Sequence, residues 1–468
     1  MATINSALSL ITGALNADQA ALDITSNNVA NASNESYTRQ VPNWEDNTPI
    51  TINGTSYGTG VTVTGGVSQR DRVLEQRLQQ QTQLSSASSS LLSALDTLQG
   101  SFSTASSTTS TGNIGNDITN FFNSYTQLES DSTNGADRQA ILSSATTLAS
   151  DISSAASSLN AQQQSLDESA NTIVTQVNAL LTSFAEVNQQ IQSTSPNSDA
   201  GALEDQRQAD LTQLSNLIGF NEVTTEKNGM TIETSGGQIM ATEDTAFQIT
   251  SGSLDGVTHF YLNGTDITSD LTSAGGELGG VLTARDQSIP NTMASLDQLA
   301  YSISTSVNQI NNNGTDLDGD NGNAGNIFNA PTQVAGSALS MSVVMTDPNK
   351  IAAAGLGDDT GDDSNAVAAA NLANKTIVNG QTPANYYANI VSTVGALVSQ
   401  TTTDNTALSA SVSQLQTQND SLSAVSLDDE ASNLEDFQRS YQAASQVFTI
   451  LNSVMASALN LGVETAVS

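Results

Sequence analysis

Side chains that commonly perform chemistry are scarce in this sequence. Its 468 residues include no cysteine and one histidine, His259. Without thiols the chain can form no disulfide, Cys-ligated zinc site or iron–sulfur cluster. A catalytic triad or a multi-histidine metal site would depend on His259 alone, which lies in a polar, strand-like stretch, VTHFYLN. We therefore interpret His259 as a structural or surface residue.

Enzyme motifs give no further support for catalysis. The sequence contains no H-E-x-x-H, Walker or G-x-G-x-x-G motif, and these motifs mark metalloproteases, nucleotide hydrolases and dinucleotide-binding enzymes. A catalytic site would have to use carboxylates, lysine or serine. We therefore predict that the protein is not an enzyme and uses no cofactor.

Three aspartates at alternate positions are a weak candidate for a metal site. Asp316, Asp318 and Asp320 lie in the segment GTDLDGDNGNAGNIF, and calcium favours several carboxylate oxygens that converge on one turn. The segment departs from an EF-hand loop, because Asn321 replaces the sharp-turn glycine and Ile327 replaces the bidentate glutamate. We interpret it as a Gly/Asp/Asn turn that binds no metal.

The charge of the chain excludes two classes of partner. Eleven Lys and Arg stand against 47 Asp and Glu, for a formal net charge of −36. This charge repels phosphate backbones and anionic lipids, so we expect no nucleic acid and no membrane as a partner. The amino-terminal segment MATINSALSLITGALNADQ also lacks the basic start and the unbroken apolar run of a signal peptide.

Apolar residues recur every seven residues at both ends of the chain. Near the amino terminus they are Leu8, Leu15, Leu22 and Val29. Near the carboxy terminus one row is Leu427, Leu434, Tyr441, Phe448 and Met455, and a second is Phe437, Ala444, Leu451 and Ala458. This period predicts two helices with coiled-coil stripes. A single helix in water would leave its apolar stripe exposed to solvent. We therefore expect the two terminal helices to lie side by side.

A longer helical block lies between the two ends. Apolar residues keep the seven-residue period from Ile152 to Val187, and a helix over 138–194 would be about 85 Å long. Compatible stripes over 74–98 and 387–422 predict further helices. We therefore expect a rod of long antiparallel helices contributed by both halves of the chain.

Two stretches interrupt the helical pattern. In 222–285, short runs such as MTIET and HFYLN alternate with Gly, Asp and Ser, which predicts a small β-rich insertion. A Gly- and Thr-rich stretch at 50–66 predicts a short hairpin, and Asn53-Gly54 suits its tight turn. The predicted fold is thus mainly α with a β-rich insertion, with the N- and C-terminal helices paired as a coiled coil.

These elements suggest three domains. Residues 1–45 with 424–468 form a terminal coiled-coil domain. Residues 46–221 with 286–423 form the helical rod domain, which includes the hairpin, and 222–285 form the insertion.

Two further groups of residues permit more than one interpretation. Arg70, Arg72 and Arg77 cluster where the first rod helix begins; we interpret them as a solvated helix face with local pairing, and contact with an acidic neighbouring subunit is the alternative. Trp44, the sole tryptophan, follows Pro42 and suits the anchor of a local loop, or else a contact between subunits.

Both ends of the chain resemble the axial proteins of the bacterial flagellum. The segment ALNADQAALDITSNNVANASNESYTRQ resembles the amino-terminal signature of rod, hook and hook-associated proteins, and NLEDFQRSYQAASQVFTILNSVMASALNL resembles the carboxy-terminal one. Two interior segments, GELGGVLTARDQSIPNTMASLDQLAYSISTSVNQI and GTDLDGDNGNAGNIF, narrow the resemblance to the hook-associated protein 1 family.

This resemblance implies a structural protein of the flagellum and a role in motility. It implies a hook–filament junction ring that self-assembles at the hook tip through the terminal helices. The implied partners are copies of the same chain, hook protein, the second junction protein (hook-associated protein 3) and an export chaperone. The implied location is extracellular, in the flagellum, after export by the flagellar type III apparatus without a cleaved signal peptide.

The predicted assembly interface combines the two apolar stripes with the signature residues beside them. It consists of Leu8, Leu15, Leu22, Val29, Asn27, Asn31, Tyr37, Arg39, Gln40, Leu434, Phe437, Gln438, Tyr441, Phe448, Leu451 and Met455.

Two alternative functions remain open at this point. Another axial protein, such as a hook or filament subunit, would share the terminal signatures, but hook protein would be β-rich where this chain has the helical block at 138–220. A secreted calcium-binding adhesin would require that the Asp316 segment binds calcium and that both ends are dispensable.

Overall fold

The longest element is helix α4, Gly135–Thr194, with 60 residues. At 1.5 Å per residue it is about 90 Å long. Its buried residues include Ile152, Leu159, Ile173 and Val187, which confirms the predicted seven-residue period. Asn134 caps its first turn, because the side chain accepts hydrogen bonds from the amides of the next turn.

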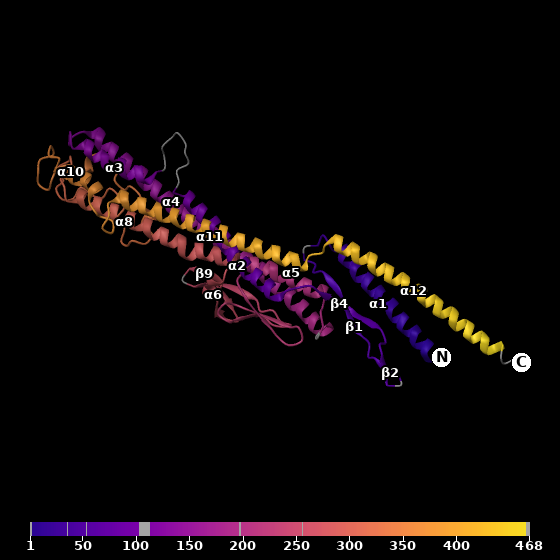
Figure 1. The fold of residues 1–468 in the computed structure, drawn as a ribbon. Coiled ribbons are helices and arrows are strands. Elements are labelled where there is room, and N and C mark those ends of the chain that lie inside the picture. The colour runs from indigo at the N-terminus through magenta and orange to yellow at the C-terminus, as the bar shows by residue number, and fades with distance from the viewer. Residues whose placement is uncertain are drawn as a thin grey trace.

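The computed structural model describes residues 2–34, 36–52, 54–102, 113–195, 198–254 and 256–464. Helices dominate and the sheets are small and antiparallel, so the chain is mainly α as predicted. The molecule is elongated, with both termini at one end and α3 and α10 at the other (Figure 1). In the described part of the chain, no helix is long and apolar enough to cross a membrane.

One hydrophobic core lies in the half of the rod that is distant from the termini. It joins α3 (Ile114–Leu128) and the first half of α4 to α8 (Ile289–Asn312) and α11 (Pro383–Ser423). Phe121 is at its centre, with ring centroids 5.6 Å from Tyr125 and 5.5 Å from Phe328. Short elements complete this half: α9 (Ser337–Ser340), α10 (Ser364–Ala370) and the 3-10 helices Pro348–Lys350 and Asn371–Asn374.

A second core fills the half of the rod closer to the termini. The second half of α4 packs there with α5 (Ala202–Leu217) and with two three-stranded sheets. One sheet contains β5 (Asn221–Thr224), β6 (Met230–Glu233) and β7 (Ile239–Ala241). The other contains β8 (Ile249–Leu254), β9 (Val257–Leu262) and β10 (Thr265–Asp266).

The β-structure ends earlier than the sequence pattern suggested. Residues 268–283 form α6 (Thr268–Ala274) and α7 (Gly276–Thr283), followed by a π-helical turn, Ala284–Ser288. Glycines hide the helical pattern here, and the fold needs one of them for close packing. A Cβ atom on Gly280 would lie 2.2 Å from the carbonyl oxygen of Ala87, so glycine lets α7 approach α2 (Arg72–Gly100).

The predicted hairpin is longer than the stretch 50–66. Strand β1 (Gln40–Asp46) pairs antiparallel with β4 (Val61–Ser68), and β2 (Ile50–Ile52) pairs with β3 (Thr55–Tyr57) at its end. Strand β1 therefore crosses the predicted domain boundary at residue 45. Gly54, at φ +81°, lies in the turn, and Asn53 falls outside the described residues.

A serine motif in this hairpin has no catalytic context. Residues 54–58, GTSYG, fit the pattern G-x-S-x-G, which marks a nucleophile only on a strand-to-helix turn. Ser56 instead lies in β3 of the hairpin. His259 lies on β9, where its Nδ1 is 2.6 Å from Asp266 Oδ2.

The two terminal helices lie side by side and antiparallel. Helix α1 (Ala2–Ala30) and helix α12 (Leu427–Glu464) pack together, and α1 also contacts β1 and β4 (Figure 1). Three residues, 424–426, separate α11 from α12. Ser426 caps α12, since its Oγ accepts a hydrogen bond from the Asp429 amide at 3.4 Å.

Candidate assembly surface and its joint with the rod

The predicted stripe on α12 faces α1 but is incompletely covered. Leu434, Phe437, Phe448, Leu451 and Met455 are half-buried, and Tyr441 and Gln438 are exposed. Among residues 427–458, whose side chains are described, Glu430 alone is buried. One subunit therefore leaves much of this apolar stripe in contact with solvent.

The most buried face of α1 differs from the predicted stripe. Leu8, Leu15 and Leu22 are half-buried and Val29 is exposed. The buried residues are instead small or polar: Ala17, Asp18, Ala21, Thr25 and Asn28. Asp18, Ala21, Thr25 and Asn28 recur every three or four residues, and α1 contacts the hairpin as well as α12. A search for large apolar side chains does not detect such a face.

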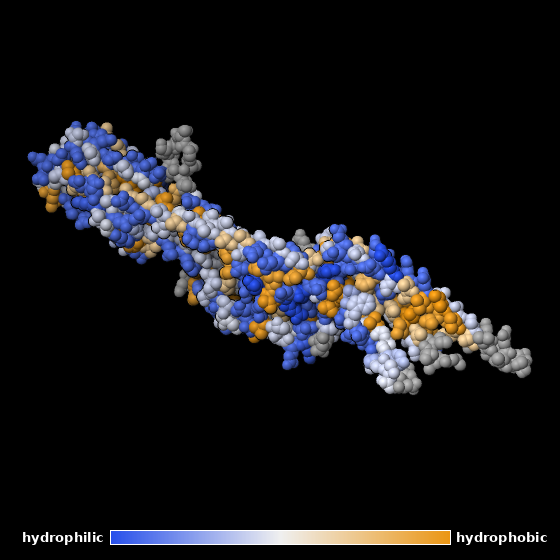
Figure 2. Space-filling model, in the orientation of Figure 1, coloured by the Kyte–Doolittle hydropathy of each residue, from blue (hydrophilic) through white to orange (hydrophobic). Residues whose placement is uncertain are grey.

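A second apolar row runs along α12 outside the predicted stripe. Val447, Ile450 and Val454 are 42%, 60% and 47% exposed. Each precedes a stripe residue by one position, so the row is rotated by about 100° around the helix. Figure 2 shows hydrophobic surface over this outer part of the paired terminal helices. This row leaves a second apolar face of α12 exposed.

At the base of the terminal pair, Asn28 joins three segments. Its Nδ2 donates to the carbonyl oxygen of Gln40 at 2.8 Å and to Glu430 Oε2 at 3.1 Å. Its Oδ1 accepts from the Tyr37 hydroxyl at 2.8 Å and from the Gln40 amide at 3.0 Å. Two donors and two acceptor positions are the full capacity of an amide side chain, so Asn28, which is 1% exposed, is fully satisfied.

Glu430 is the partner of Asn28 on α12. The carboxylate is 1% exposed and also accepts from Arg39 Nε at 2.7 Å. Burial, followed by the charges of Asp205 and Glu430, raises the pKa of Tyr37 to about 12. The Tyr37 hydroxyl therefore stays protonated and remains a donor at neutral pH.

The signature residues of the predicted interface thus have contacts within the chain. Tyr37, Arg39 and Gln40 connect α1, β1 and α12. Asn31 donates from Nδ2 to Asn27 Oδ1 at 2.7 Å, at the end of α1. Glu430 was missed in the sequence, although it stands seven residues before Phe437, a stripe position where an apolar residue is expected.

A cluster of ion pairs holds the hairpin and α2 to α5. Arg70 Nη2 lies 2.6 Å from Asp205 Oδ1, and its other nitrogens lie 3.6 Å from Glu75 and 3.7 Å from Glu204. Arg72 Nη2 lies 3.1 Å from Glu204 Oε2. The Arg70 side chain is 7% exposed. The interpretation of this group as a solvated helix face is therefore wrong for Arg70, which reaches acids from α5 that lie far along the sequence.

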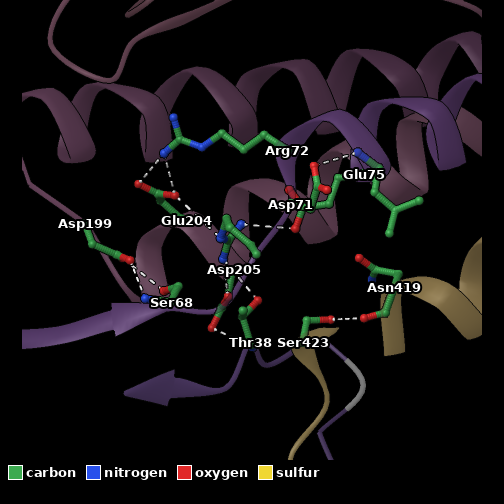
Figure 3. Close-up of polar contacts among 12 residues, drawn as sticks. Thr38, Ser68, Asp71, Arg72, Glu75, Asp199, Glu204, Asp205, Asn419 and Ser423 are labelled. Carbon is green, nitrogen blue, oxygen red and sulfur yellow. Dashed lines mark hydrogen bonds and ion pairs between the residues drawn. The ribbon is translucent and has the colours of Figure 1, made fainter. Parts of the chain in front are cut away.

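The same cluster reaches the segment that follows α1. Figure 3 shows Thr38 directed at Asp205, and Ser68 of β4 directed at Asp199. The Thr38 amide donates to Asp205 Oδ2 at 3.3 Å, and Ser68 Oγ donates to Asp199 Oδ1 at 3.0 Å. The Arg39 amide donates to the carbonyl oxygen of Ser423, at the end of α11, at 2.8 Å. The joint between terminal helices and rod is therefore built from polar contacts.

Burial dominates the electrostatics of this joint. It raises the pKa of Asp205, although hydrogen bonds from Thr38 and the charge of Arg70 lower it. It also raises the pKa of Glu75, against the charges of Arg70 and Arg72. For both carboxylates, the charge of Arg70 lowers the pKa against the effect of burial and so favours the ionised form.

A cation of the chain itself occupies the weak metal candidate. Lys350 Nζ lies 3.0 Å from Asp316 Oδ2, 3.1 Å from Asp318 Oδ2 and 2.6 Å from Asp320 Oδ2. The hydrogen bonds that Lys350 donates to Asp320, Asp316 and Asp318 raise the pKa of Lys350. Within the described residues, no group of three or more His, Asp or Glu side chains is arranged to hold a metal ion. The ammonium thus supplies the positive charge at this turn.

Trp44 connects the hairpin to the terminal pair. Its ring centroid is 6.2 Å from that of Phe437 on α12, and the residue is 42% exposed. It lies in strand β1. Trp44 is therefore a contact between elements of one chain, with one side left open.

Comparisons with known proteins match the chain over most of its length. Residues 96–328 match the model of the flagellar hook-associated protein FlgK helical domain, and residues 11–38 match the flagella basal body rod protein model. Flagellar hook-associated protein 1 of Bacillus subtilis (strain 168) is 25% identical over 96% of both chains. Its counterpart in Escherichia coli (strain K12) is 25% identical over 98% of this chain and 99% of that one.

A solved structure shares the fold. The flagellar hook junction protein FlgK from Burkholderia pseudomallei superposes with a TM-score of 0.64 at 18% identity. The match covers 73% of this chain and 99% of that chain.

Proposed function

The chain belongs to the flagellar hook-associated protein 1 family, and we propose that it forms a ring at the hook tip by self-assembly through its terminal helices. It is a structural protein of the hook–filament junction of the bacterial flagellum, and its family is a structural one. The proposal concerns how the subunits join, which residues they use and which proteins they meet.

The observation that carries this proposal is the incomplete burial of α12. Its inner stripe is half-buried against α1, and the row Val447, Ile450 and Val454 is exposed. Exposed apolar rows on neighbouring faces of one helix suit contacts with more than one partner. We propose that α1 and α12 pair as a coiled coil within a subunit and that the second row packs on adjacent subunits.

The domain roles follow from this arrangement. Residues 1–45 with 424–468 would line the inner tube, 46–221 with 286–423 would form the surrounding rod, and 222–285 would project from it. The polar joint formed by Asn28, Arg39 and Glu430 orients the terminal pair on the rod. The direct contacts of Tyr37, Arg39 and Gln40 would then orient the interface from within the subunit.

The proposed partners are those of an axial protein at this position. They are further copies of the chain, hook protein on one side, hook-associated protein 3 on the other and an export chaperone before assembly. We propose export by the flagellar type III apparatus without a cleaved signal peptide. The absence of cysteine suits this route, because no disulfide constrains an unfolded chain.

Phe448→Asp tests the proposed interface. The variant places a charge in the half-buried stripe, and burial of an unpaired charge is strongly unfavourable. In a motility assay of a strain that lacks the native protein, we expect loss of swimming and, in electron micrographs, hooks without filaments. The matched control is Thr449→Asp, which adds the same charge at the next, exposed position and should support swimming. Normal filaments with Phe448→Asp would refute the assembly role of the stripe.

A further inference from the structure

We propose that Glu430, through Asn28, fixes the register in which α1 and α12 pair. The inference concerns pairing within one subunit and does not depend on ring formation. The apolar stripes by themselves permit more than one register.

The apolar stripes alone do not define a unique register. Counting outward from the Asn28–Glu430 contact along two antiparallel helices places Ala21 opposite Phe437, and Ala7 opposite Leu451, so both helices carry apolar residues at these seven-residue steps. Because both stripes repeat every seven residues, a shift by seven again places apolar residues opposite each other. Such a shift moves one helix by about 10 Å and costs little apolar contact.

Chain connectivity does not settle the register either. Nine residues, 31–39, connect the end of α1 to the start of β1. Fully extended, they span about 30 Å, which exceeds the movement that a seven-residue shift requires. A specific contact must therefore select the register.

Glu430 is a polar residue at a stripe position. It precedes Phe437 by seven residues and is 1% exposed, whereas the apolar stripe residues of α12 are only half-buried. Its carboxylate accepts from Asn28 Nδ2 and from Arg39 Nε. Single buried polar residues in coiled-coil seams specify register in this way, because only one alignment satisfies their hydrogen bonds.

A shifted pair would leave this cluster unsatisfied. A shift by seven in one direction places Glu430 opposite Ala21, which offers no hydrogen-bond donor from its side chain. Asn28 would lose a partner as well, and its four hydrogen bonds in the observed register use its full capacity. A buried carboxylate without partners is strongly disfavoured. The cluster thus penalises the shifted registers that the apolar stripes tolerate.

Because the chain contains no cysteine, engineered cysteine pairs can report the register directly. In the full chain, Ala14→Cys with Ala444→Cys reports the observed register, and Ala7→Cys with Ala444→Cys reports the shift of seven that places Glu430 opposite Ala21. Each pair is treated with a short bismaleimide crosslinker. Intramolecular product is measured by electrophoresis, with Glu430 intact and with Glu430→Leu or Glu430→Gln.

With Glu430 intact, we expect the first pair to crosslink about tenfold more than the second, as a single selected register requires. Glu430→Leu should reduce this ratio to about threefold or less, because the shifted seam gains an apolar contact. Glu430→Gln keeps an acceptor for Asn28 and should retain most of the preference. Because the same two pairs are compared across the variants, their intrinsic reactivities cancel.

Three outcomes would overturn the proposal. The first is a tenfold preference that persists in Glu430→Leu, and the second is no preference when Glu430 is intact. The third is loss of both crosslinks in Glu430→Leu, which would assign Glu430 to pairing itself. The ring contact between Trp44 and Phe437 could also select the register, and Trp44→Ala is the control for it. This variant should keep the crosslinking preference. Loss of the preference in Trp44→Ala would mean that the hairpin sets the register.

Discussion

The rod and the terminal pair use the same seven-residue apolar period with different results. Helix α4 buries residues along its whole length, from Arg138 to Ile191, against two cores. Helix α12 buries only Glu430 among the residues 427–458. Periodicity therefore identifies a helix that needs partners, and burial shows whether one chain supplies them. The rod buries its apolar residues within one subunit, whereas the terminal pair leaves apolar surface exposed.

The contacts that join the two regions differ from those within the rod. The elements of the rod pack through aromatic and aliphatic side chains, such as Phe121 of α3 and Phe328 in the segment between α8 and α9. The joint instead consists of Arg39–Glu430 and Arg70–Asp205 ion pairs with hydrogen bonds from Asn28 and Thr38. Polar contacts of this kind are directional, so the joint orients the terminal pair without extending the hydrophobic core.

The largest expected effect on stability comes from a substitution in the core of the rod. Phe184 on α4 is 1% exposed, and Phe184→Ala should lower the free energy of unfolding by about 3–5 kcal/mol. Leu451→Ala in the half-buried stripe should lower it by only about 1 kcal/mol, since less surface is lost. Denaturant unfolding followed by circular dichroism measures both. Equal losses would mean that the terminal pair is as well packed as the rod.

A pH-dependent effect is expected between α3 and α4. Burial, with the hydrogen bond and charge of Asp151, raises the pKa of Asp117 from 3.8 to about 7. A raised carboxyl pKa means that the folded state binds a proton more tightly than the unfolded state. The stabilisation by this proton is therefore present at low pH and is lost as the pH rises from about 4 to about 7.

Asp117→Asn tests this effect. The amide stays neutral, so the variant should be more stable than the native chain at pH 8, by about 1–3 kcal/mol, and similar to it at pH 4. Denaturant midpoints across this pH range measure the change. Glu186→Gln, at an exposed acid on α4, is the control. Parallel pH profiles for the native chain and Asp117→Asn would contradict the buried-pair interpretation.

The smallest expected effect on the monomer lies in the second row of α12. Ile450 is 60% exposed, so Ile450→Ser should change the free energy of unfolding of the isolated subunit by less than about 0.5 kcal/mol. The same variant should impair filament attachment, because the proposed neighbour contact loses its apolar side chain. Thermal melting and a swimming assay measure the two effects. Normal swimming would limit assembly to the inner stripe.

Several elements could be predicted because their signal is local. The period from Ile152 to Val187 defined α4, and the stripes at Leu8–Val29 and Leu427–Met455 defined the terminal helices. Helix α7 was missed because its glycines, including Gly280, remove the apolar pattern while they permit close packing on α2. Strand β1 was missed because its partner, β4, pairs with it across an intervening hairpin.

The joint could not be predicted from residue types. Arg70 stands beside Glu75 in the sequence, but its closest acid is Asp205, 135 residues away. Lys350 forms ion pairs with three aspartates that lie 30 or more residues before it. Whether an ionised side chain is solvated or buried depends on which distant segment packs over it. The residues next to it in the sequence do not indicate which segment that is.

The sequence by itself determined that both ends are helices with apolar stripes, since a seven-residue period is a property of consecutive residues. Only the tertiary structure decided which polar residues lie between those helices. Asn28 and Glu430 are separated by 402 positions, and each alone has the appearance of an ordinary surface residue. Their burial follows from antiparallel packing, which brings the end of α1 to the start of α12 and excludes water from both side chains.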